Sequence, residues 1–383
     1  MAWKEVSIMS AREEFVRLAM QPGANKSELC RRFEISRPTG NKWIARFTAQ
    51  GKAGLKDRSR RPRSSPARTA ETVEQAIVDL RAQHPAWGAR KLRARLQALG
   101  VADLPTAAST VHAIVQRHGL VSPEESDKRK AFQRFEHAQP NELWQMDFKG
   151  HVPLQNGARC HPLTVLDDHS RYNLCLRACA NEQGHSVQAA LTDTFRCYGL
   201  PQWMITDNGA PWGDSAAHRY TALGVWLIRL GISISHSRPY HPQTLGKDER
   251  FHRTLLAELL SREPLIDLSH AQRRFDAWRP VYNLERPHES LGMQPPISRY
   301  RPSTRAFPEE LPPIEYPHGV TLRRVQDKGE LSYRGRSYRL SKALKGYRVA
   351  LRPNLEHDGL LDVYFCHQRV GELNLHTHEL TQV

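Results

Sequence analysis

The sequence predicts a multidomain protein, with α-helical helix-turn-helix modules at the N-terminus, an α/β core with a mixed sheet, and a small β-barrel at the C-terminus. Helical periodicity with turn residues fills the first third of the chain, and strand-like patterns that alternate with helical ones run from 141 to about 235. Short strand-like runs broken by glycine occupy 320–375. A length of 383 residues suits about two to four domains.

Pro-rich and charge-rich stretches set the expected boundaries between these regions. No internal repeat and no low-complexity tract outside the linkers interrupts their order. We expect, in chain order, a helix-turn-helix domain (1–51), a basic linker (52–70), a second helical, helix-turn-helix-like domain (71–121), a linker (122–140), the α/β core with a helical extension (141–300), a Pro-rich linker (301–317) and the small β-barrel (318–383).

The chain is strongly basic. Its formal net charge is +16, from 56 Lys and Arg against 40 Asp and Glu, and its pI is about 9.8. Such a balance favours a polyanionic partner, most often nucleic acid. The alternative is an ordinary basic soluble protein, which charge alone does not exclude.

A reducing compartment and no membrane insertion are expected. No apolar run approaches the ~18 residues of a transmembrane helix, and the N-terminal segment MAWKEVSIMSAREEF lacks the apolar stretch of a signal peptide. The 6 cysteines are scattered without a CxxC pair, which favours free thiols and disfavours a structural zinc site. We therefore expect a cytoplasmic protein.

Residues 10–50 predict two helices in a helix-turn-helix arrangement. Ser27 and Ser36 can each cap a helix, and Pro38 suits the first turn of the second helix, where its missing N–H costs nothing. The second helix would then read the DNA major groove. A plain helical hairpin is the alternative, and the basic charge of the chain favours DNA binding. The outward-facing candidates for DNA contact are Arg37, Thr39, Asn41 and Lys42.

The segment 52–68, KAGLKDRSRRPRSSPAR, carries seven Lys and Arg, one Asp and no helical face. A solvated linker is one interpretation of this segment. The other is an arm that follows DNA phosphates or lies in the minor groove, and both can hold. The candidate contacts in the arm are Arg58, Arg60, Arg61 and Arg63. Three short amphipathic helices between 71 and 120 then predict a second DNA-binding unit or a small structural bundle.

Three acidic positions stand out in the α/β region. In LWQMDFKG, Asp147 lies on the strand face opposite its large apolar neighbours. Asp207 ends the apolar strand of QWMITDNG, and sites gather at the carboxyl ends of strands in open α/β sheets. The third position is Asp248 or Glu249, at the start of a helix after the loop RPYHPQTLG. Helical spacing favours neither of these two residues.

Each acidic residue alone has an ordinary explanation, because Asp-Asn-Gly is a common turn and the helix dipole favours an acid at a helix start. Together, three carboxylates cannot share a pocket in ionised form without a cation. Their hard oxygen ligands suit Mg²⁺ or Mn²⁺. Two such ions, about 3.5–4 Å apart, can hold the attacking and the leaving oxygen of an in-line phosphoryl transfer.

The ordered motifs LWQMDFKG, TVLDDHSRY, ITDNG and RPYHPQTLGKDERFHRTL resemble the integrase core of bacterial insertion-sequence transposases, which are relatives of retroviral integrases. The similarity covers 141–300, and the predicted ends of the chain fit the same architecture. It implies a ribonuclease-H-like fold with a catalytic metal triad of Asp147, Asp207 and Glu249. The family's last carboxylate follows the Pro-Gln-x-x-Gly loop by three residues, which selects Glu249 and leaves Asp248 as the alternative.

Two departures from the family pattern bear on DNA recognition. The interval between Asp207 and Glu249 is longer than in many relatives, and its extra residues, with APWGDSAAH as the candidate, either contact DNA or only pack. The N-terminal His/Cys zinc module of retroviral integrases has no counterpart in the sequence, and helix-turn-helix units take its place. We therefore expect a different recognition of DNA ends.

Polar residues beside the third carboxylate are candidates for holding DNA, and a solvated loop or helix face is the alternative for each. These candidates are His241, Gln243, Lys247, Arg250 and Arg253. In the motif DDHSR, Asp167 and Asp168 are expected to form a turn with a local salt bridge to Arg171 rather than a metal site.

The resemblance implies a DNA transposase that binds the terminal inverted repeats of an insertion sequence and catalyses metal-dependent strand cleavage and strand transfer into target DNA. It implies Mg²⁺ or Mn²⁺, with two ions expected, and a dimer or larger assembly on DNA at the bacterial nucleoid, without a membrane partner. One alternative is a helix-turn-helix DNA-binding regulator with an inactive core, against which the three carboxylates argue. Another is a metal nuclease that hydrolyses DNA without joining it.

Overall fold

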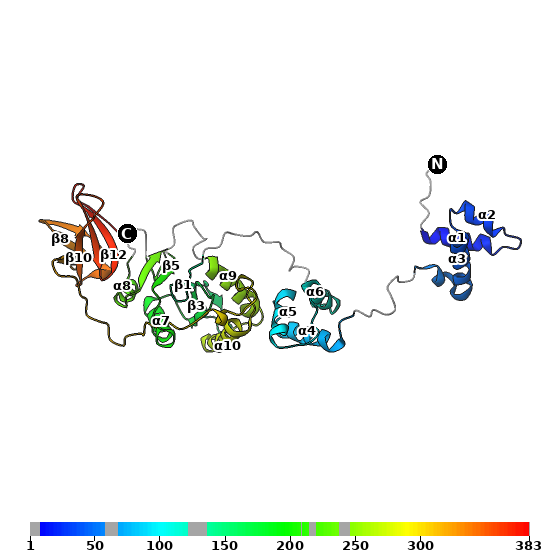
Figure 1. Ribbon diagram of the computed structural model, residues 1–383, viewed down its shortest axis with the longest axis horizontal. Coiled ribbons are helices and arrows are strands. Elements are labelled where there is room, and N and C mark those ends of the chain that lie inside the picture. Colours follow the sequence, from blue (N-terminus) through cyan, green and yellow to red (C-terminus); the bar gives the residue numbers. More distant parts are fainter. Residues whose placement is uncertain are drawn as a thin grey trace. The chain divides into compact units, whose positions relative to one another are not determined.

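The computed structural model describes residues 8–57, 68–121, 136–207, 209–213, 220–236 and 246–382 (Figure 1). The chain divides into two compact units, Met1–Arg68 and Thr69–Val383. The finer boundaries expected within the second unit stay predictions. No helix in the described ranges is long and apolar enough to cross a membrane.

Within residues 8–57, the first unit forms the helices α1 (Ile8–Ala19), α2 (Lys26–Arg32) and α3 (Arg37–Gln50), followed by the 3-10 turn η1 (Gly51–Leu55). Ser36 caps α3, as predicted, by accepting a hydrogen bond from the Thr39 N–H at 3.3 Å. The cap of α2 is Asn25 and not the predicted Ser27. Because α2 already begins at Lys26, Asn25 holds the cap position and accepts from the N–H groups of Ser27 and Glu28.

A small apolar core holds these helices together, and it contains Phe15, Val16, Cys30, Trp43 and Leu55. The helices approach one another closely at Gly40 on α3, where an added Cβ would lie 2.6 Å from Cys30 Sγ and 2.9 Å from the Phe15 ring. This close contact fixes α3, the predicted reading helix, against α1 and α2.

The second unit begins with the helices α4 (Glu71–Gln83), α5 (Ala89–Ala98) and α6 (Ala108–Arg117). Their apolar faces form a separate core around Ile77, Trp87 and Leu92. The helical module predicted at 71–121 is therefore present as three short helices, as the amphipathic pattern indicated.

The core sheet contains, among the described residues, β1 (Leu143–Phe148), β2 (Val152–Pro153), β3 (Arg159–Asp167), β4 (Asn173–Cys179), β5 (Trp203–Thr206) and β6 (Ser233–His236). The strand order is β2-β3-β1-β5-β6, and β4 pairs with β3. Strand β1 runs antiparallel to β3 and parallel to β5, and β5 runs parallel to β6. The predicted mixed sheet is confirmed.

Helices lie on both faces of this sheet. They are α7 (Gly184–Tyr198), α8 (Ala222–Arg229), α9 (Gly246–Leu255) and α10 (Leu268–Pro280). The π-helical turns η4 (Leu256–Leu260) and η5 (Val281–Glu285) continue α9 and α10, and the 3-10 turns η6 (Glu289–Leu291) and η7 (Pro296–Ser298) follow.

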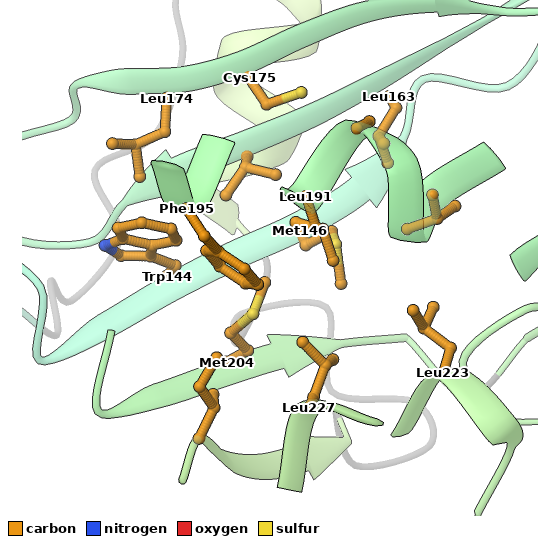
Figure 2. Close-up of a cluster of buried hydrophobic side chains, with 14 of the residues drawn as sticks. Trp144, Met146, Leu163, Leu174, Cys175, Leu191, Phe195, Met204, Leu223 and Leu227 are labelled. Atoms are coloured by element: carbon orange, nitrogen blue, oxygen red, sulfur yellow. The ribbon is translucent and has the colours of Figure 1, made fainter. Parts of the chain in front are cut away.

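A large apolar cluster joins one face of the sheet to α7 and α8, and we call this side the apolar face. Trp144 and Met146 of β1 meet Leu191 and Phe195 of α7 and Leu227 of α8 there (Figure 2). Because side chains alternate along a strand, the residue after Met146 must point to the opposite side of the sheet.

The opposite side packs against α9 and α10, and we call it the α9 face. Its apolar part includes Leu166, Leu176, Phe251 and Phe275. Buried polar side chains lie on the same side, namely Thr164, Asp248 and His252. The α9 face therefore mixes a hydrophobic contact with a polar, partly ionisable cluster.

The C-terminal region is a small β-domain with strands β7 (Thr321–Arg324), β8 (Glu330–Tyr333), β9 (Arg336–Arg339), β10 (Arg348–Pro353), β11 (Leu360–Phe365), β12 (Gln368–Asn374) and β13 (Glu379–Gln382), and the 3-10 turn η8 (Lys342–Leu344) between β9 and β10. The described strands form an open sheet in the order β13-β12-β11-β10-β7 and a separate β8-β9 hairpin. An all-β domain is confirmed, whereas closure into a barrel stays a prediction.

The β-domain packs on α8 and on the edge of the core sheet. Val225 and Ile228 of α8 belong to the same apolar cluster as Val349 and Phe365. The Gln368 side chain accepts from the Ile234 N–H at 3.3 Å and donates to the Ile234 carbonyl at 3.4 Å. The Gln368 side-chain amide thereby forms, on the edge strand β6, the two hydrogen bonds that a neighbouring strand would otherwise form.

Candidate active site

The first two predicted carboxylates lie at the ends of adjacent strands. Asp147 pairs with Thr164 in the register of β1 and β3, so it faces the α9 side. Asp207 directly follows β5, which is parallel to β1 and hydrogen-bonded to it. Asp207 Oδ1 accepts a hydrogen bond from the Gly209 N–H at 3.1 Å, which holds the carboxylate.

Both carboxylates are electrostatically unfavourable as they stand. Burial raises the pKa of Asp147 to about 7, the charge of Asp207 adds to the rise, and a hydrogen bond from the Phe148 N–H at 2.8 Å opposes it. Burial also raises the pKa of Asp207, against the Gly209 N–H and His236. Neither carboxylate forms an ion pair with a described Lys, Arg or His. A cation bound between the two aspartates would relieve this repulsion.

The two candidates for the third carboxylate, Asp248 and Glu249, have different surroundings in the structure. Asp248, in the first turn of α9, is fully buried and accepts a hydrogen bond from Thr164 Oγ1 at 3.4 Å. Burial, and then the charge of Asp147, raise the pKa of Asp248 well above its ordinary value. Glu249 is exposed. The structure thus places Asp248 against Asp147, and the role of Glu249 as a metal ligand stays a prediction.

One oxygen of Asp248 is left without a partner. Asp248 Oδ2 is buried and finds no hydrogen-bond partner among the described residues. A buried polar atom without a partner costs on the order of 1–3 kcal/mol, more if it is charged. A bound cation or a proton on the carboxyl would each satisfy this oxygen, which lies in the first turn of α9 near Asp147.

His252 is a member of this cluster that the sequence did not reveal. Its Nε2 lies 2.8 Å from Thr164 Oγ1, and burial, followed by the nearby charge of Lys149, lowers the pKa of His252 to about 3. The ring is therefore neutral at physiological pH. The available signal was its position one helical turn after Asp248 and Glu249, which places it on the same side of the helix as the carboxylates.

The donor set fits a hard divalent cation, although the site is not fully assembled. Carboxylate oxygens without protein counter-ions are what Mg²⁺ and Mn²⁺ take as ligands. In the ranges that the structure describes, no three acidic, His or Cys side chains converge closely enough to hold an ion. The metal triad of Asp147, Asp207 and Glu249 therefore stays a prediction.

The DDHSR motif forms the predicted turn, but with different partners. Asp167 Oδ2 accepts from the Ser170 N–H at 2.8 Å and from the Ser170 hydroxyl at 2.6 Å, and Oδ1 accepts from the Asn141 N–H at 2.7 Å. These donors occupy the Asp167 carboxylate, and Arg171 instead pairs with Glu136 at 2.9 Å. The predicted salt bridge within the motif is therefore wrong, whereas its structural role is confirmed.

The predicted DNA-contacting residues of the core have different surroundings. Lys247 pairs with the buried Asp168, and its side chain is only 19% exposed. Burial and Arg171 lower the pKa of Lys247, while Asp168 raises it. Arg250 and Arg253 on α9 are exposed. His241 and Gln243 lie outside the described residues.

The predicted DNA-contacting residues of the first unit are grouped at the start of α3. Arg37, Asn41 and Lys42 are exposed, which suits a reading helix. Thr39 is half-buried, and its hydroxyl and N–H both interact with the Ser36 side chain at the cap. The candidates of the basic arm lie outside the described residues: Arg58, Arg60, Arg61 and Arg63.

Known protein families match the N-terminal, core and C-terminal parts of the chain. An integrase core domain matches residues 137–242, and a second integrase core description matches residues 230–296. A helix-turn-helix domain matches residues 11–63, and a homeodomain-like domain matches residues 39–115. The C-terminal domain of IS481 family transposases matches residues 320–381. The predicted resemblance to insertion-sequence transposases with an integrase core is confirmed.

Two curated relatives come from bacterial insertion elements. An uncharacterized 31.7 kDa protein of insertion element IS407 from Burkholderia multivorans is 30% identical over 157 residues, which are 41% of this chain and 54% of that protein. An uncharacterized 39.2 kDa protein of IS476 from Xanthomonas euvesicatoria is 27% identical over 253 residues, which are 64% of this chain and 69% of that protein. The chain thus spans about half the length of the first relative and about two thirds of the second.

Two solved structures that the chain resembles are of retroviral integrases. The HTLV-2 integrase catalytic core domain in complex with magnesium is 17% identical, with a TM-score of 0.34 over 43% of this chain and 99% of that chain. A simian T-cell lymphotropic virus intasome is 16% identical, with a TM-score of 0.38 over 76% of this chain and 98% of that chain. At these scores neither likeness supports an argument about function.

Proposed function

We propose that this chain is a DNA transposase that binds the terminal inverted repeats of an insertion sequence, cleaves a strand at each end and joins the freed 3′ hydroxyl to target DNA. The observation that carries this proposal is the pair Asp147 and Asp207. These two carboxylates lie at adjacent strand ends, without protein counter-ions among the described residues, and within the integrase core match. The net charge of +16 and the helix-turn-helix and homeodomain-like matches fit a DNA substrate.

The site would hold Mg²⁺ or Mn²⁺, and two ions are expected. Asp147 and Asp207 would supply one carboxylate each, and Glu249 would supply the third. Glu249 is exposed on α9, so its carboxylate can meet an ion that also binds a DNA phosphate, whereas Asp248 is fully buried. The bound ions supply activation of the attacking oxygen and stabilisation of the charge that develops on the phosphate.

The protein residues around the site would orient it. Thr164 Oγ1 contacts the Asp147 carbonyl at 3.0 Å, Asp248 at 3.4 Å and the neutral His252 at 2.8 Å. This hydroxyl therefore joins β1, β3 and α9 at the level of the carboxylates. Such a fixed arrangement supports the alignment that an in-line displacement needs.

The remaining parts of the molecule would bind DNA. Arg37, Asn41 and Lys42 of α3 would contact base edges or phosphates of the inverted repeat, and the basic arm at 52–70 would follow the phosphates. Arg250 and Arg253 would hold phosphates near the site. Because two DNA ends must be paired before strand transfer, we expect a dimer or larger assembly on DNA.

The test is a strand-transfer assay with the full-length chain, end DNA, target DNA and Mg²⁺ or Mn²⁺. We expect nicked ends and joined products, and we expect Asp147→Asn to abolish both while end binding persists. A metal-independent footprint without any nick would favour the alternative, a DNA-binding regulator with an inactive core. Nicks without joined products would indicate a metal nuclease.

A further inference from the structure

We infer that Asp168 and Lys247 are positioning residues, which fix the start of α9 against β1, and that Lys247 does not hold DNA. The inference rests on the proposed function, because it assigns α9 to the reaction site. It concerns two residues that are 79 positions apart in the sequence and form a buried ion pair.

Asp168 connects three separate segments of the core through one carboxylate. Its Oδ2 accepts from the His137 N–H at 3.0 Å, in the segment that precedes β1. Its Oδ1 accepts from Gln145 Nε2 at 2.8 Å and from Lys247 Nζ. Gln145 lies on β1 two residues before Asp147, and Lys247 lies on α9 directly before Asp248. One buried group, 2% exposed, therefore joins the two elements that carry the acidic residues of the site.

Lys247 needs this partner where it stands. A cation in the first turn of a helix is disfavoured by the helix dipole, which carries positive charge at that end. Lys247 Nζ donates to the Asp168 carboxylate and, at 3.3 Å, to the Asp168 carbonyl. Both contacts point the side chain toward Asp168 in the β3–β4 turn. The pair thus offsets an unfavourable charge and at the same time fixes where α9 begins.

Two further ion pairs lie beside the contact between Asp168 and Lys247. Arg171, whose side chain is 7% exposed, pairs with Glu136 at 2.9 Å, and Glu136 also pairs with Arg299 at 3.0 Å. Glu136 immediately precedes His137, which binds Asp168. Glu136 is therefore held by two cations, directly beside the backbone N–H that binds Asp168.

These contacts also argue against Lys247 as a DNA ligand. To reach a phosphate, Lys247 would have to leave Asp168, a carboxylate that is 2% exposed, without its cation. Breaking a buried pair by removing one partner is strongly unfavourable, because the remaining charge stays buried. Arg253 on the same helix is exposed and can reach a phosphate without this loss.

The experiment compares Lys247→Met, Asp168→Asn and the double variant with wild type, as full-length chains. Three quantities are measured: the rate of strand transfer with saturating end DNA, the slope of end-DNA affinity against salt concentration, and the affinity for Mn²⁺ by calorimetry with end DNA present. Arg196→Met is the matched control, because Arg196 of α7 forms an exposed ion pair with Glu309, and its loss should change none of the three.

We expect each single variant to lose about 10- to 100-fold in rate, since a misplacement of about 1 Å can cost 10²-fold. The Mn²⁺ affinity should fall, the salt slope should stay unchanged, and the double variant should be no worse than the poorer single one. A salt slope that falls by about 1 in Lys247→Met, as for the loss of one phosphate contact, would overturn the inference. So would full rate and full Mn²⁺ affinity in both single variants.

The outcomes separate this inference from the proposed function. If wild type neither nicks nor joins DNA, the proposed function fails, and the salt slope and the Mn²⁺ affinity still decide the role of Lys247. If Lys247→Met does not fold, as shown by its melting temperature, Asp168→Asn alone decides. In Asp168→Asn, Lys247 loses its ion-pair partner. The affinity for end DNA should then rise if Lys247 reaches DNA, and it should stay unchanged if Lys247 is a positioning residue.

Discussion

The two faces of the core sheet differ in what they bury. The apolar face packs Trp144 and Met146 against α7 and α8, and its contacts are those of an ordinary hydrophobic core. The α9 face buries Thr164, Asp248 and His252 beside its apolar cluster, and it leaves Asp248 Oδ2 without a described partner. A sheet that needed only stability would not carry this polar cluster. The difference teaches that one face holds the strands in place while the other presents their carboxylates.

The largest effect should come from removing a carboxylate of the α9 face. Asp147→Asn should lower the rate of strand transfer by at least about 10³-fold, because it removes a charged ligand rather than a single hydrogen-bond donor. The melting temperature of the metal-free chain should not fall, since the raised pKa of Asp147 shows that its charge is unfavourable there. Product analysis on gels, together with thermal unfolding, checks both. A lower melting temperature with lost activity would make Asp147 a structural residue.

The third carboxylate can be assigned with a pair of neighbouring variants. Glu249→Gln should lower the rate about as much as Asp147→Asn and leave end binding intact, whereas Asp248→Asn should retain most of the rate. The physical reason is that, of the two side chains, Glu249 is exposed to solvent and Asp248 is fully buried. Single-turnover strand transfer measures the two rates. The reverse order of effects would assign the third ligand to Asp248.

A substitution on the apolar face should lower the stability and leave the rate of strand transfer nearly unchanged. Leu191→Ala should destabilise the second unit by about 2–5 kcal/mol, because it removes buried methyl groups and leaves a cavity. At a temperature where the variant stays folded, the rate of strand transfer should change little. Denaturant unfolding and a strand-transfer assay at that temperature measure the two. A large loss of rate in a fully folded variant would show that the two faces do not divide their roles.

The smallest expected effect is a dependence of stability on pH in the absence of metal. Asp147 keeps its proton in the folded chain up to about pH 7, whereas its ordinary pKa is 3.8, so unfolding releases protons between these values. Asp207 and Asp248 are shifted in the same direction. The part of the stability that Asp147 contributes should therefore fall as pH rises from about 4 to 7 and should level off above. Thermal unfolding with a chelator, in wild type and in Asp147→Asn, measures this slope, which should be shallower in the variant.

The sequence was informative where a pattern is local. The alternation around Asp147 predicted that this residue lies on the side of β1 opposite Trp144 and Met146, and the apolar run before Asp207 predicted that a strand ends there. Ser36 was recognisable as a cap because it precedes an amphipathic helix with Pro38 in the first turn. In each of these cases the signal lies within a few residues of the feature.

Other features depend on contacts that no local pattern reports. Asp248 and Glu249 are about 100° apart on the helix, so both fit the apolar spacing, and only packing against β1 and β3 separates them. The partner of Lys247 is Asp168, from a turn far away in the sequence, and charge alone pointed to DNA. Closure of the C-terminal strands likewise depends on pairings between strands and not on any one strand.

The most direct test of the α9 face as the metal site is a Mn²⁺ titration of the full-length chain in complex with end DNA, followed by calorimetry. We expect wild type to bind Mn²⁺, with about two ions per chain in contact with DNA, and we expect Asp147→Asn and Asp207→Asn each to lose this binding. Unchanged Mn²⁺ affinity and stoichiometry in both variants would contradict the assignment of these two aspartates as metal ligands.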